Sequence, residues 1–149
     1  MTTNEVSRQP LSKRDLLSRL VPPQLTNEKA LSGMEILLKE EEFDPNFRII
    51  IQGQPGDKMY FISEGDVEIV SRGAFAMGRP ERLAVLKAGD LFGEMAIVLN
   101  RPRSADVVAL TPVKAFSLSS GGWQHMKAFF PGFAVHVEEI AARRVGINK

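Results

Sequence analysis

Turn-forming residues recur at short intervals through the middle of the chain, and this spacing leaves room only for short strands between them. Turns are predicted at Asp44-Pro45-Asn46, Gly53 to Asp57, Glu64-Gly65-Asp66 and Ala88-Gly89-Asp90. Apolar and polar residues alternate between the turns, as they do in half-buried strands. Strands are predicted at about residues 47–52, 58–63, 66–72, 81–87, 104–110 and 112–118. Many short strands with glycine-rich turns favour a mainly β fold, an antiparallel β-roll of the jelly-roll type with flanking helices.

Helical patterns precede and follow the predicted roll. Ser12 and Asp15 form a capping-box pattern at the start of a short N-terminal helix. After the last strand, Ser119 or Ser120 can begin a helix, which the Pro131-Gly132 pair breaks before a final helix. The predicted division is a loose tail at 1–10 and a single domain at 11–149, with a helical prelude at 11–40, the roll at 42–118 and two C-terminal helices at 119–146.

The final predicted helix has an apolar face and a wetter side. The apolar positions are Phe133, Val137, Ile140, Ala141 and Val145, and the wetter positions are Glu138, Glu139, Arg143 and Arg144. We therefore expect the first set to pack against the domain and the second set to meet solvent.

The chain's charge is nearly balanced, because its 149 residues include 19 basic and 18 acidic side chains. Such a balance gives no overall attraction to nucleic acid or to an anionic membrane, so any binding must come from a local site. The absence of cysteine excludes disulfides and thiolate chemistry. The polar start and the lack of a long apolar run indicate a soluble, cytoplasmic protein with no direct membrane insertion.

Residues 92–105 combine a turn glycine, a short apolar helix and an arginine that returns into a strand. Gly93 allows the backbone to approach a ligand closely, and a helix beginning at about Glu94 would present N–H groups and a positive dipole end there. Arg103 adds a permanent cation whose donors match phosphate oxygens. Glu94 can only accept hydrogen bonds when ionised, so it favours a hydroxyl group. A small phosphorylated sugar would satisfy both side chains.

This stretch resembles the phosphate-binding cassette of the cyclic-nucleotide-binding domain family, which includes the catabolite activator protein, protein kinase A regulatory subunits and cyclic-nucleotide-gated channels. Residues 53–69 are similar to a second family feature, in the family's order and spacing, so the resemblance covers roughly residues 36–145. It implies a short phosphate-binding helix within the roll. Asn46 stands where the family usually has glycine, and asparagine tolerates a left-handed turn. Asp106 brings a charge where a neutral residue is commoner, and strand alternation predicts that it faces away from Arg103.

The resemblance also implies a role for individual residues. The expected positions are Arg103, Ser104, Gly93 and Ala96 at the ligand phosphate, Glu94 at the ribose 2′-hydroxyl, Ile69 and Leu83 in apolar contact with the nucleotide, and Phe130, Pro131 and Gly132 as a hinge for the last helix. Other interpretations stay open at this point. Arg103 could be a surface residue paired with Glu94 or Asp106, Glu94 could merely complement a helix N-terminus, and Ile69 and Leu83 could be ordinary core residues.

We therefore predict a regulatory sensor that binds a cyclic purine nucleotide, with cAMP favoured over cGMP, and that catalyses no reaction. No cofactor other than this ligand is expected. Ser104 permits either nucleotide. The predicted output is a movement of the C-terminal helix, which an effector domain or partner protein would contact through the terminal helices.

Three alternatives stay open. The chain could be a fragment of a catabolite-activator-type transcription regulator without its helix-turn-helix, although the few residues after Val145 leave no place for a recognition helix, so no nucleic acid is expected. A cupin-like metal enzyme would need several histidines inside the roll, whereas His125 and His136 fall on predicted helices, so no metal is expected. The chain could also be a regulatory module of a channel or signalling enzyme.

Overall fold

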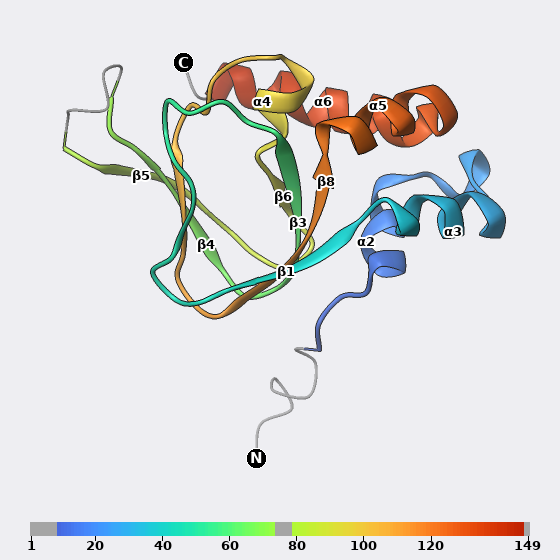
Figure 1. Cartoon of the computed structure of the whole chain (residues 1–149), viewed down its shortest axis with the longest axis horizontal. Helices are drawn as coiled ribbons and strands as arrows, with labels where there is room; N and C mark the ends of the chain where they lie inside the picture. The colour runs from blue at the N-terminus through green and yellow to red at the C-terminus, as the bar shows by residue number, and fades with distance from the viewer. Residues whose placement is uncertain (1–8, 74–78, 148–149) are drawn as a thin grey trace.

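The computed structural model describes residues 9–73 and 79–147 and contains two antiparallel four-stranded sheets (Figure 1). The first sheet has the order β1 (Lys39–Phe43), β8 (Val113–Ser119), β3 (Lys58–Glu64) and β6 (Leu91–Phe92). The second sheet has the order β2 (Arg48–Ile50), β7 (Asp106–Ala109), β4 (Val67–Ser71) and β5 (Glu81–Leu86). Together the sheets confirm the predicted mainly β roll.

Helices flank this roll and also interrupt it. The N-terminal helices are α2 (Lys13–Leu20), the 3-10 helix η1 (Pro23–Leu25) and α3 (Glu28–Ile36). The short helix α4 (Glu94–Val98) lies between β6 and β7, and α5 (Ser120–Phe129) and α6 (Pro131–Ile147) follow β8. Figure 1 shows α2, α3, α5 and α6 gathered on the same side of the roll, beyond β3 and β8. The capping box predicted for α2 is present, because Ser12 Oγ accepts from the Asp15 amide and the Asp15 carboxylate accepts from the Ser12 amide.

Strand β3 contributes side chains to both hydrophobic cores of the molecule. Met59 and Phe61 point into a core formed with the helices, whereas Tyr60 and Ile62 point into a second core inside the roll. Since alternate side chains of a strand face opposite sides of a sheet, a strand covered on both sides is apolar at consecutive positions. Residues 59–63 of β3 are accordingly all buried.

Two details of the roll differ from the sequence-based expectation. The sequence placed a helical prelude at 11–40 and the roll from 42, but residues 39–43 form strand β1 and pair with β8, although Glu40, Glu41 and Glu42 give no apolar alternation. These charges are accommodated by lysines, since Glu41 pairs with Lys58 at 3.1 Å and Glu40 with Lys114 at 3.7 Å. The two-residue strand β6 was also not predicted, because a segment this short has no readable period. Asn46 adopts the left-handed conformation, with φ +71°.

Candidate functional site

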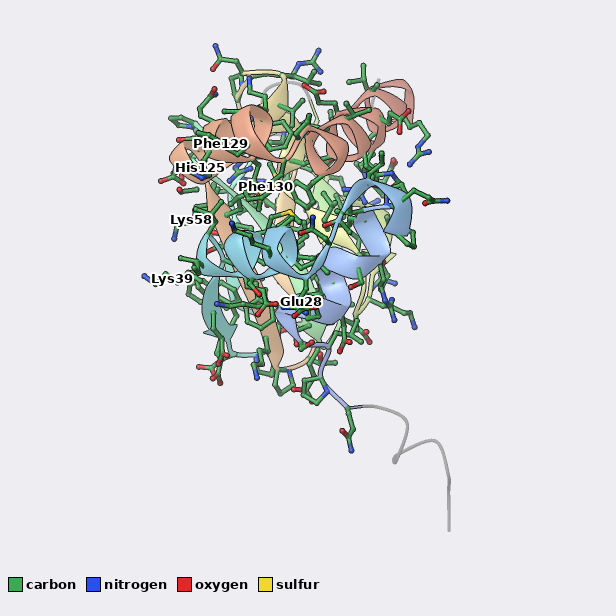
Figure 2. All side chains as sticks on the ribbon, turned by 90° about the vertical axis from the view of Figure 1, so that its right-hand side faces the viewer. Glu28, Lys39, Lys58, His125, Phe129 and Phe130 are labelled. Carbon is green, nitrogen blue, oxygen red and sulfur yellow. The ribbon has the colours of Figure 1, made fainter. Side chains whose placement is uncertain are left out.

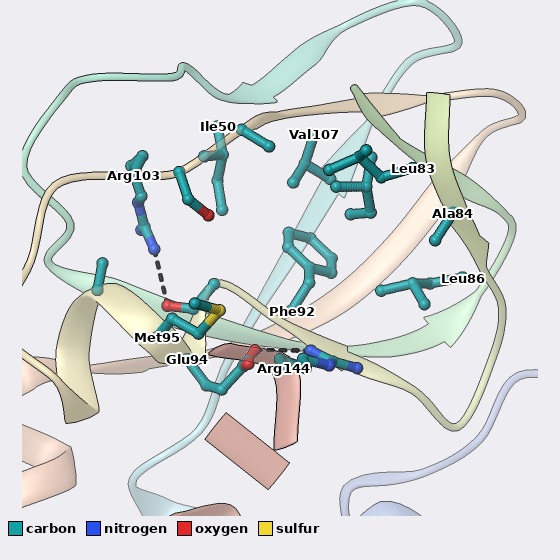
Figure 3. Close-up of a pocket in the computed structure, with 15 residues that line it drawn as sticks. Ile50, Leu83, Ala84, Leu86, Phe92, Glu94, Met95, Arg103, Val107 and Arg144 are labelled. Carbon is teal, nitrogen blue, oxygen red and sulfur yellow. Dashed lines mark hydrogen bonds and ion pairs between the residues drawn. The ribbon is translucent and has the colours of Figure 1, made fainter. Parts of the chain in front are cut away.

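A pocket of about 240 Å³ opens into the roll beside α4 (Figure 3). It is lined by every residue that the sequence predicted for the phosphate, the ribose and the apolar contacts, namely Gly93, Glu94, Ala96, Arg103, Ser104, Ile69 and Leu83. The lining residues that sequence reasoning did not single out are Ile50, Ala84, Leu86, Phe92, Met95, Ala105, Val107 and Arg144. The pocket therefore brings together segments of β2, β4, β5, β6, α4, the α4–β7 loop, β7 and α6.

Arg103 points into this pocket and is almost completely buried, with 8% of its surface exposed. Its Nη1 donates to the carbonyl oxygen of Gly93 at 2.7 Å, and its Nη2 donates to that of Lys58 at 2.8 Å. Within the described residues its hydrogen-bond partners are thus neutral carbonyls, and neither Glu94 nor Asp106 forms an ion pair with it. Burial lowers the pKa of Arg103. The guanidinium is therefore a poorly solvated cation whose donors are partly free for an anion.

The loop between β2 and β3 holds Arg103 in this place. The Gly53 amide donates to the Arg103 carbonyl at 2.8 Å, and the Arg103 amide donates to the Gln54 carbonyl at 2.8 Å. Gly56 leaves space for the side chain, since a Cβ at this position would lie 2.6 Å from the guanidinium carbon of Arg103. Gly93 has φ +81°, and a Cβ there would lie 3.0 Å from Arg103 Nη1. Both glycines are therefore required by a close approach to the guanidinium.

Glu94, the first residue of α4, is 1% exposed and meets an arginine from the last helix (Figure 3). Its Oε1 accepts a hydrogen bond from Arg144 Nη1 at 2.7 Å, and the same nitrogen donates to the Leu91 carbonyl at 2.7 Å. Its Oε2 accepts no hydrogen bond from any residue that the structure describes. Burial raises the pKa of Glu94, and the nearby Arg144 and Arg103 counteract this only in part. The pocket thus contains a buried acceptor that a ligand hydroxyl could satisfy.

The prediction that Arg144 lies on the wetter side of the last helix is wrong. Only 26% of its side chain is exposed, and the guanidinium reaches Glu94 on α4. Helical periodicity gives the direction in which a side chain leaves the helix, but a long arginine can extend across the surface and bury its head group. Glu94 lies 50 residues away in the sequence, so no local signal indicated the pair.

The remaining predicted contact residues divide the pocket into a polar end and an apolar end. Figure 3 shows Arg103 at one end of the pocket and Leu83, Ala84 and Leu86 at the other. Leu83 is 39% exposed and lines the pocket, whereas Ile69 is half-buried and both lines the pocket and packs against the core of the roll. Ser104 is exposed at the polar end, next to Arg103.

The expected hinge residues lie where α5 meets α6. Phe130 is the single residue between the two helices and is non-helical, with φ −135° and ψ 63°. Pro131 and Gly132 belong to the first turn of α6, and proline is favoured at this position because its missing N–H would have no helical partner. The ring of Phe130 packs against Gly33 of α3, where a Cβ would lie 3.2 Å from it. Figure 2 shows Phe130 near His125 and Phe129 of α5.

Other features of the described structure bear on the rival functions. Among residues 9–73 and 79–147, no three histidine, aspartate or glutamate side chains are grouped so that they could hold a metal ion. His125 lies on α5, outside the roll, with its ring 4.6 Å from that of Phe129. A larger hollow of about 970 Å³ lies near Leu11, Asp44 and Lys87, but it contains none of the predicted site residues. No helix in the described part of the chain has the length and apolar character needed to cross a membrane.

Comparison with known proteins identifies a family for this chain and supports its fold. The family model described as the cyclic nucleotide-binding domain matches residues 40–128. The cAMP-dependent protein kinase regulatory subunit of Yarrowia lipolytica is 33% identical over 89 residues, which are 60% of this chain and 22% of that protein. The CRP-like cAMP-activated global transcriptional regulator of Mycobacterium tuberculosis is 27% identical over 131 residues, which are 88% of this chain and 58% of that protein.

Among solved structures, the regulatory subunit of a cAMP-independent protein kinase A from Trypanosoma cruzi, bound to guanosine, is also similar. It superimposes with a TM-score of 0.69 and 28% identity, covering 88% of this chain and 45% of that one. The chain therefore spans about a fifth to just over half of the length of these relatives.

Proposed function

Because this chain belongs to the cyclic nucleotide-binding domain family, we propose that it is a regulatory module whose ligand is a cyclic purine nucleotide, with cAMP as the preferred one. The observation that carries this proposal is the buried Arg103 guanidinium, which faces the pocket and has carbonyl oxygens as its only hydrogen-bond partners within residues 9–73 and 79–147. An anion with several acceptor oxygens would complete its hydrogen bonding. In this arrangement the phosphate lies between Arg103, Ser104 and the small residues Gly93 and Ala96.

Glu94 accounts for the sugar part of the ligand. Its free Oε2 would accept a hydrogen bond from the ribose 2′-hydroxyl. A deoxyribose would leave this buried carboxylate oxygen without a partner, so the site would discriminate against it. Ile69 and Leu83, at the apolar end of the pocket, would then contact the nucleotide.

The preference for cAMP over a bare nucleoside rests on the same arginine. Two relatives are named for cAMP, whereas the Trypanosoma cruzi relative was solved with guanosine, which has no phosphate. A nucleoside would leave Arg103 with its carbonyl partners only, so the buried cation favours a phosphorylated ligand. We expect cGMP to compete less well than cAMP.

The proposed output is a change in the position of α6, with no catalysis by the chain itself. Glu94 and Arg144 link α4 to α6, so a ligand that engages Glu94 changes the energetics of this contact. A ligand can shift the helix only by its difference in affinity for the two helix positions. Phe130, Pro131 and Gly132 would absorb the movement, and an effector domain or partner protein in a cytoplasmic setting would detect it through the terminal helices.

Titration calorimetry tests the phosphate clamp directly. A charge-assisted hydrogen bond contributes about 1.5–3 kcal/mol, so Arg103→Ala should weaken cAMP binding by about one to two powers of ten. The matched control is Arg101→Ala, because Arg101 is an exposed arginine two residues away that does not line the pocket. The control should bind cAMP as the wild type does.

The same titrations with cGMP, adenosine and guanosine separate the ligand classes. We expect the order cAMP, then cGMP, then the nucleosides, with the difference between cAMP and adenosine lost in Arg103→Ala. Equal cAMP affinity in the wild type and Arg103→Ala would remove the clamp. If a nucleoside binds more tightly than either cyclic nucleotide, the ligand class is nucleosides and not cyclic nucleotides.

A further inference from the structure

Asp106 lies directly after the pocket segment but on the other face of its strand. Ala105 and Val107 line the pocket, and the alternation of side chains turns Asp106 away from it, as the sequence predicted. The residue is nevertheless only 2% exposed. A carboxylate is seldom buried unless it is paired or hydrogen-bonded, so its partners indicate what it does there.

The partners of Asp106 come from two different segments and converge on one carboxylate. Oδ1 accepts from the Gln52 amide at 2.7 Å and from Arg72 Nη2 at 3.2 Å. Oδ2 lies 3.1 Å from Arg72 Nε and 3.7 Å from Arg48 Nε. The shortest of these contacts is the one to a backbone amide, and that amide is at the start of the β2–β3 loop.

Gln52 extends the connection to the end of β4. Its Nε2 donates to the Gly73 carbonyl at 2.6 Å, and its Oε1 accepts from the Arg72 amide at 2.8 Å. Gln52 therefore fastens the loop to the segment that follows β4, while its own amide is fastened to Asp106 in β7.

The same loop supplies most of the surroundings of Arg103. Gly53 and Gln54 hydrogen-bond its main chain, Gly56 packs against its guanidinium, and Lys58 accepts from its Nη2. The residues that make these contacts lie within six positions after Gln52 in the sequence. The position of the loop consequently determines where the guanidinium points, and Asp106 fixes the loop near its start, at Gln52.

We infer that Asp106 is a positioning residue for the ligand-phosphate site, acting on Arg103 through Gln52 and the β2–β3 loop. The inference rests on the proposed function for the identity of the ligand, but the contacts that carry it belong to the chain alone. Asp106 does not touch the pocket, so its effect on binding must pass through Arg103. A carboxylate that only stabilised the second sheet would act on the whole sheet and not on this loop in particular.

Asp106→Asn tests the inference, because it keeps the size of the side chain but removes the charge that Arg72 and Arg48 share. Calorimetry with cAMP is performed on the wild type, Asp106→Asn, Arg103→Ala and the double variant. We expect Asp106→Asn to weaken cAMP binding about tenfold in the wild-type background and by less than twofold in the Arg103→Ala background. This non-additivity is the signature of two residues that act as one unit.

The matched control is Glu68→Gln. Glu68 is a carboxylate on the same face of the second sheet and pairs with Arg82 at 2.6 Å, but it makes no contact with the β2–β3 loop in the described structure. We expect it to leave cAMP affinity unchanged. If Asp106→Asn fails to fold, Gln52→Ala replaces it in the test. This variant removes the two side-chain hydrogen bonds of Gln52 to Arg72 and Gly73, and it should weaken cAMP binding about threefold. Unchanged cAMP affinity in Gln52→Ala would overturn the inference.

Amide hydrogen exchange provides a readout without ligand. In Asp106→Asn the Gly53 and Arg103 amides should exchange faster, while the amides of β3 and β8 keep their protection. The inference would be overturned if amide protection fell uniformly across both sheets or did not change at all. It would also be overturned if Asp106→Asn weakened cAMP binding equally in the wild-type and Arg103→Ala backgrounds. Tighter cAMP binding would also overturn it, because Asp106 would then chiefly screen Arg48 and Arg72.

Failure of the proposed function gives a different pattern from failure of this inference. If the wild type binds no cyclic nucleotide, the proposed function is wrong and the exchange experiment alone decides the role of Asp106. Selective exposure of the Gly53 and Arg103 amides would then support it.

Discussion

Arg103 and Glu94 are oppositely charged and line one small pocket, yet they do not pair with each other. Arg103 donates to two carbonyls, whereas Glu94 pairs with Arg144 from α6. A direct pair between them would satisfy both groups and leave little for a ligand. Their separate partners keep a donor set and an acceptor available at different points, which suits a molecule that carries both an anion and a hydroxyl.

The buried state of Glu94 leads to a prediction about pH. Since burial raises its pKa above the usual 4.5, the folded protein retains the proton at pH values where the unfolded chain has lost it. Stability therefore falls as the pH rises from 4.5 through the raised pKa. We expect the free energy of unfolding of the wild type minus that of Glu94→Gln to decrease over this range in urea titrations.

Asp15 provides a control of opposite sign for that experiment. Hydrogen bonds from the Ser12 backbone and side chain lower the pKa of Asp15 below 3.8, so the difference between wild type and Asp15→Asn should increase as the pH rises through that lower range. If the unfolding free energy of the wild type minus that of Glu94→Gln increases with pH, Arg144 stabilises the charged carboxylate by more than burial destabilises it.

Gly56 allows a second test at the level of single residues. A methyl group at this position would meet Ala96 Cβ at 2.5 Å and the guanidinium carbon of Arg103 at 2.6 Å. Gly56→Ala should therefore displace Arg103, weaken cAMP binding at least tenfold and destabilise the fold by about 1–3 kcal/mol. Calorimetry and urea unfolding measure the two effects.

Gly121→Ala is the matched control for Gly56→Ala. In helix α5 the added Cβ would meet only Ser119 Oγ, at 3.8 Å. This variant should keep its cAMP affinity, with equal or slightly higher stability because alanine favours a helix. An equal loss of affinity in both variants would mean that the space around Arg103 does not matter.

At the scale of secondary-structure elements, α6 packs in the helical core with its first half and contacts the pocket near its C-terminal end. Phe133, Ala134 and Val137 are buried in the core shared with the other helices, whereas Arg144 reaches the pocket. Near the C-terminal end of the helix, Arg144 Nη1 bonds both Glu94 and the Leu91 carbonyl.

Arg144→Gln should loosen this end of α6 in the ligand-free protein. The variant loses a charge-assisted hydrogen bond, so amide exchange in the C-terminal half of α6 should accelerate by up to about tenfold, while α5 remains unchanged. Arg143→Gln is the control, because the neighbouring Arg143 is exposed and makes no such contact in the described structure. Acceleration of the same size in both variants would contradict the role assigned to Arg144.

At the scale of the whole molecule, the sequence predicted the parts that depend on local chemistry. Turn residues and apolar alternation predicted the roll, and the run from Gly93 to Arg103 predicted residues that line one pocket, because turn geometry and side-chain chemistry both depend on nearby residues. It did not predict that Lys39 begins a strand or that Arg144 joins the pocket. Both depend on segments distant in the sequence, β8 in the first case and Glu94 in the second.

Strand β3 faces the helical core with Met59 and Phe61, the roll interior with Tyr60 and Ile62, and Arg103 with the carbonyl of Lys58. Strand β3 therefore lies between the roll, which contains the proposed ligand pocket, and the helices, which would transmit the effect of the ligand. We therefore expect substitutions that repack the helical face of β3 to change ligand affinity together with stability.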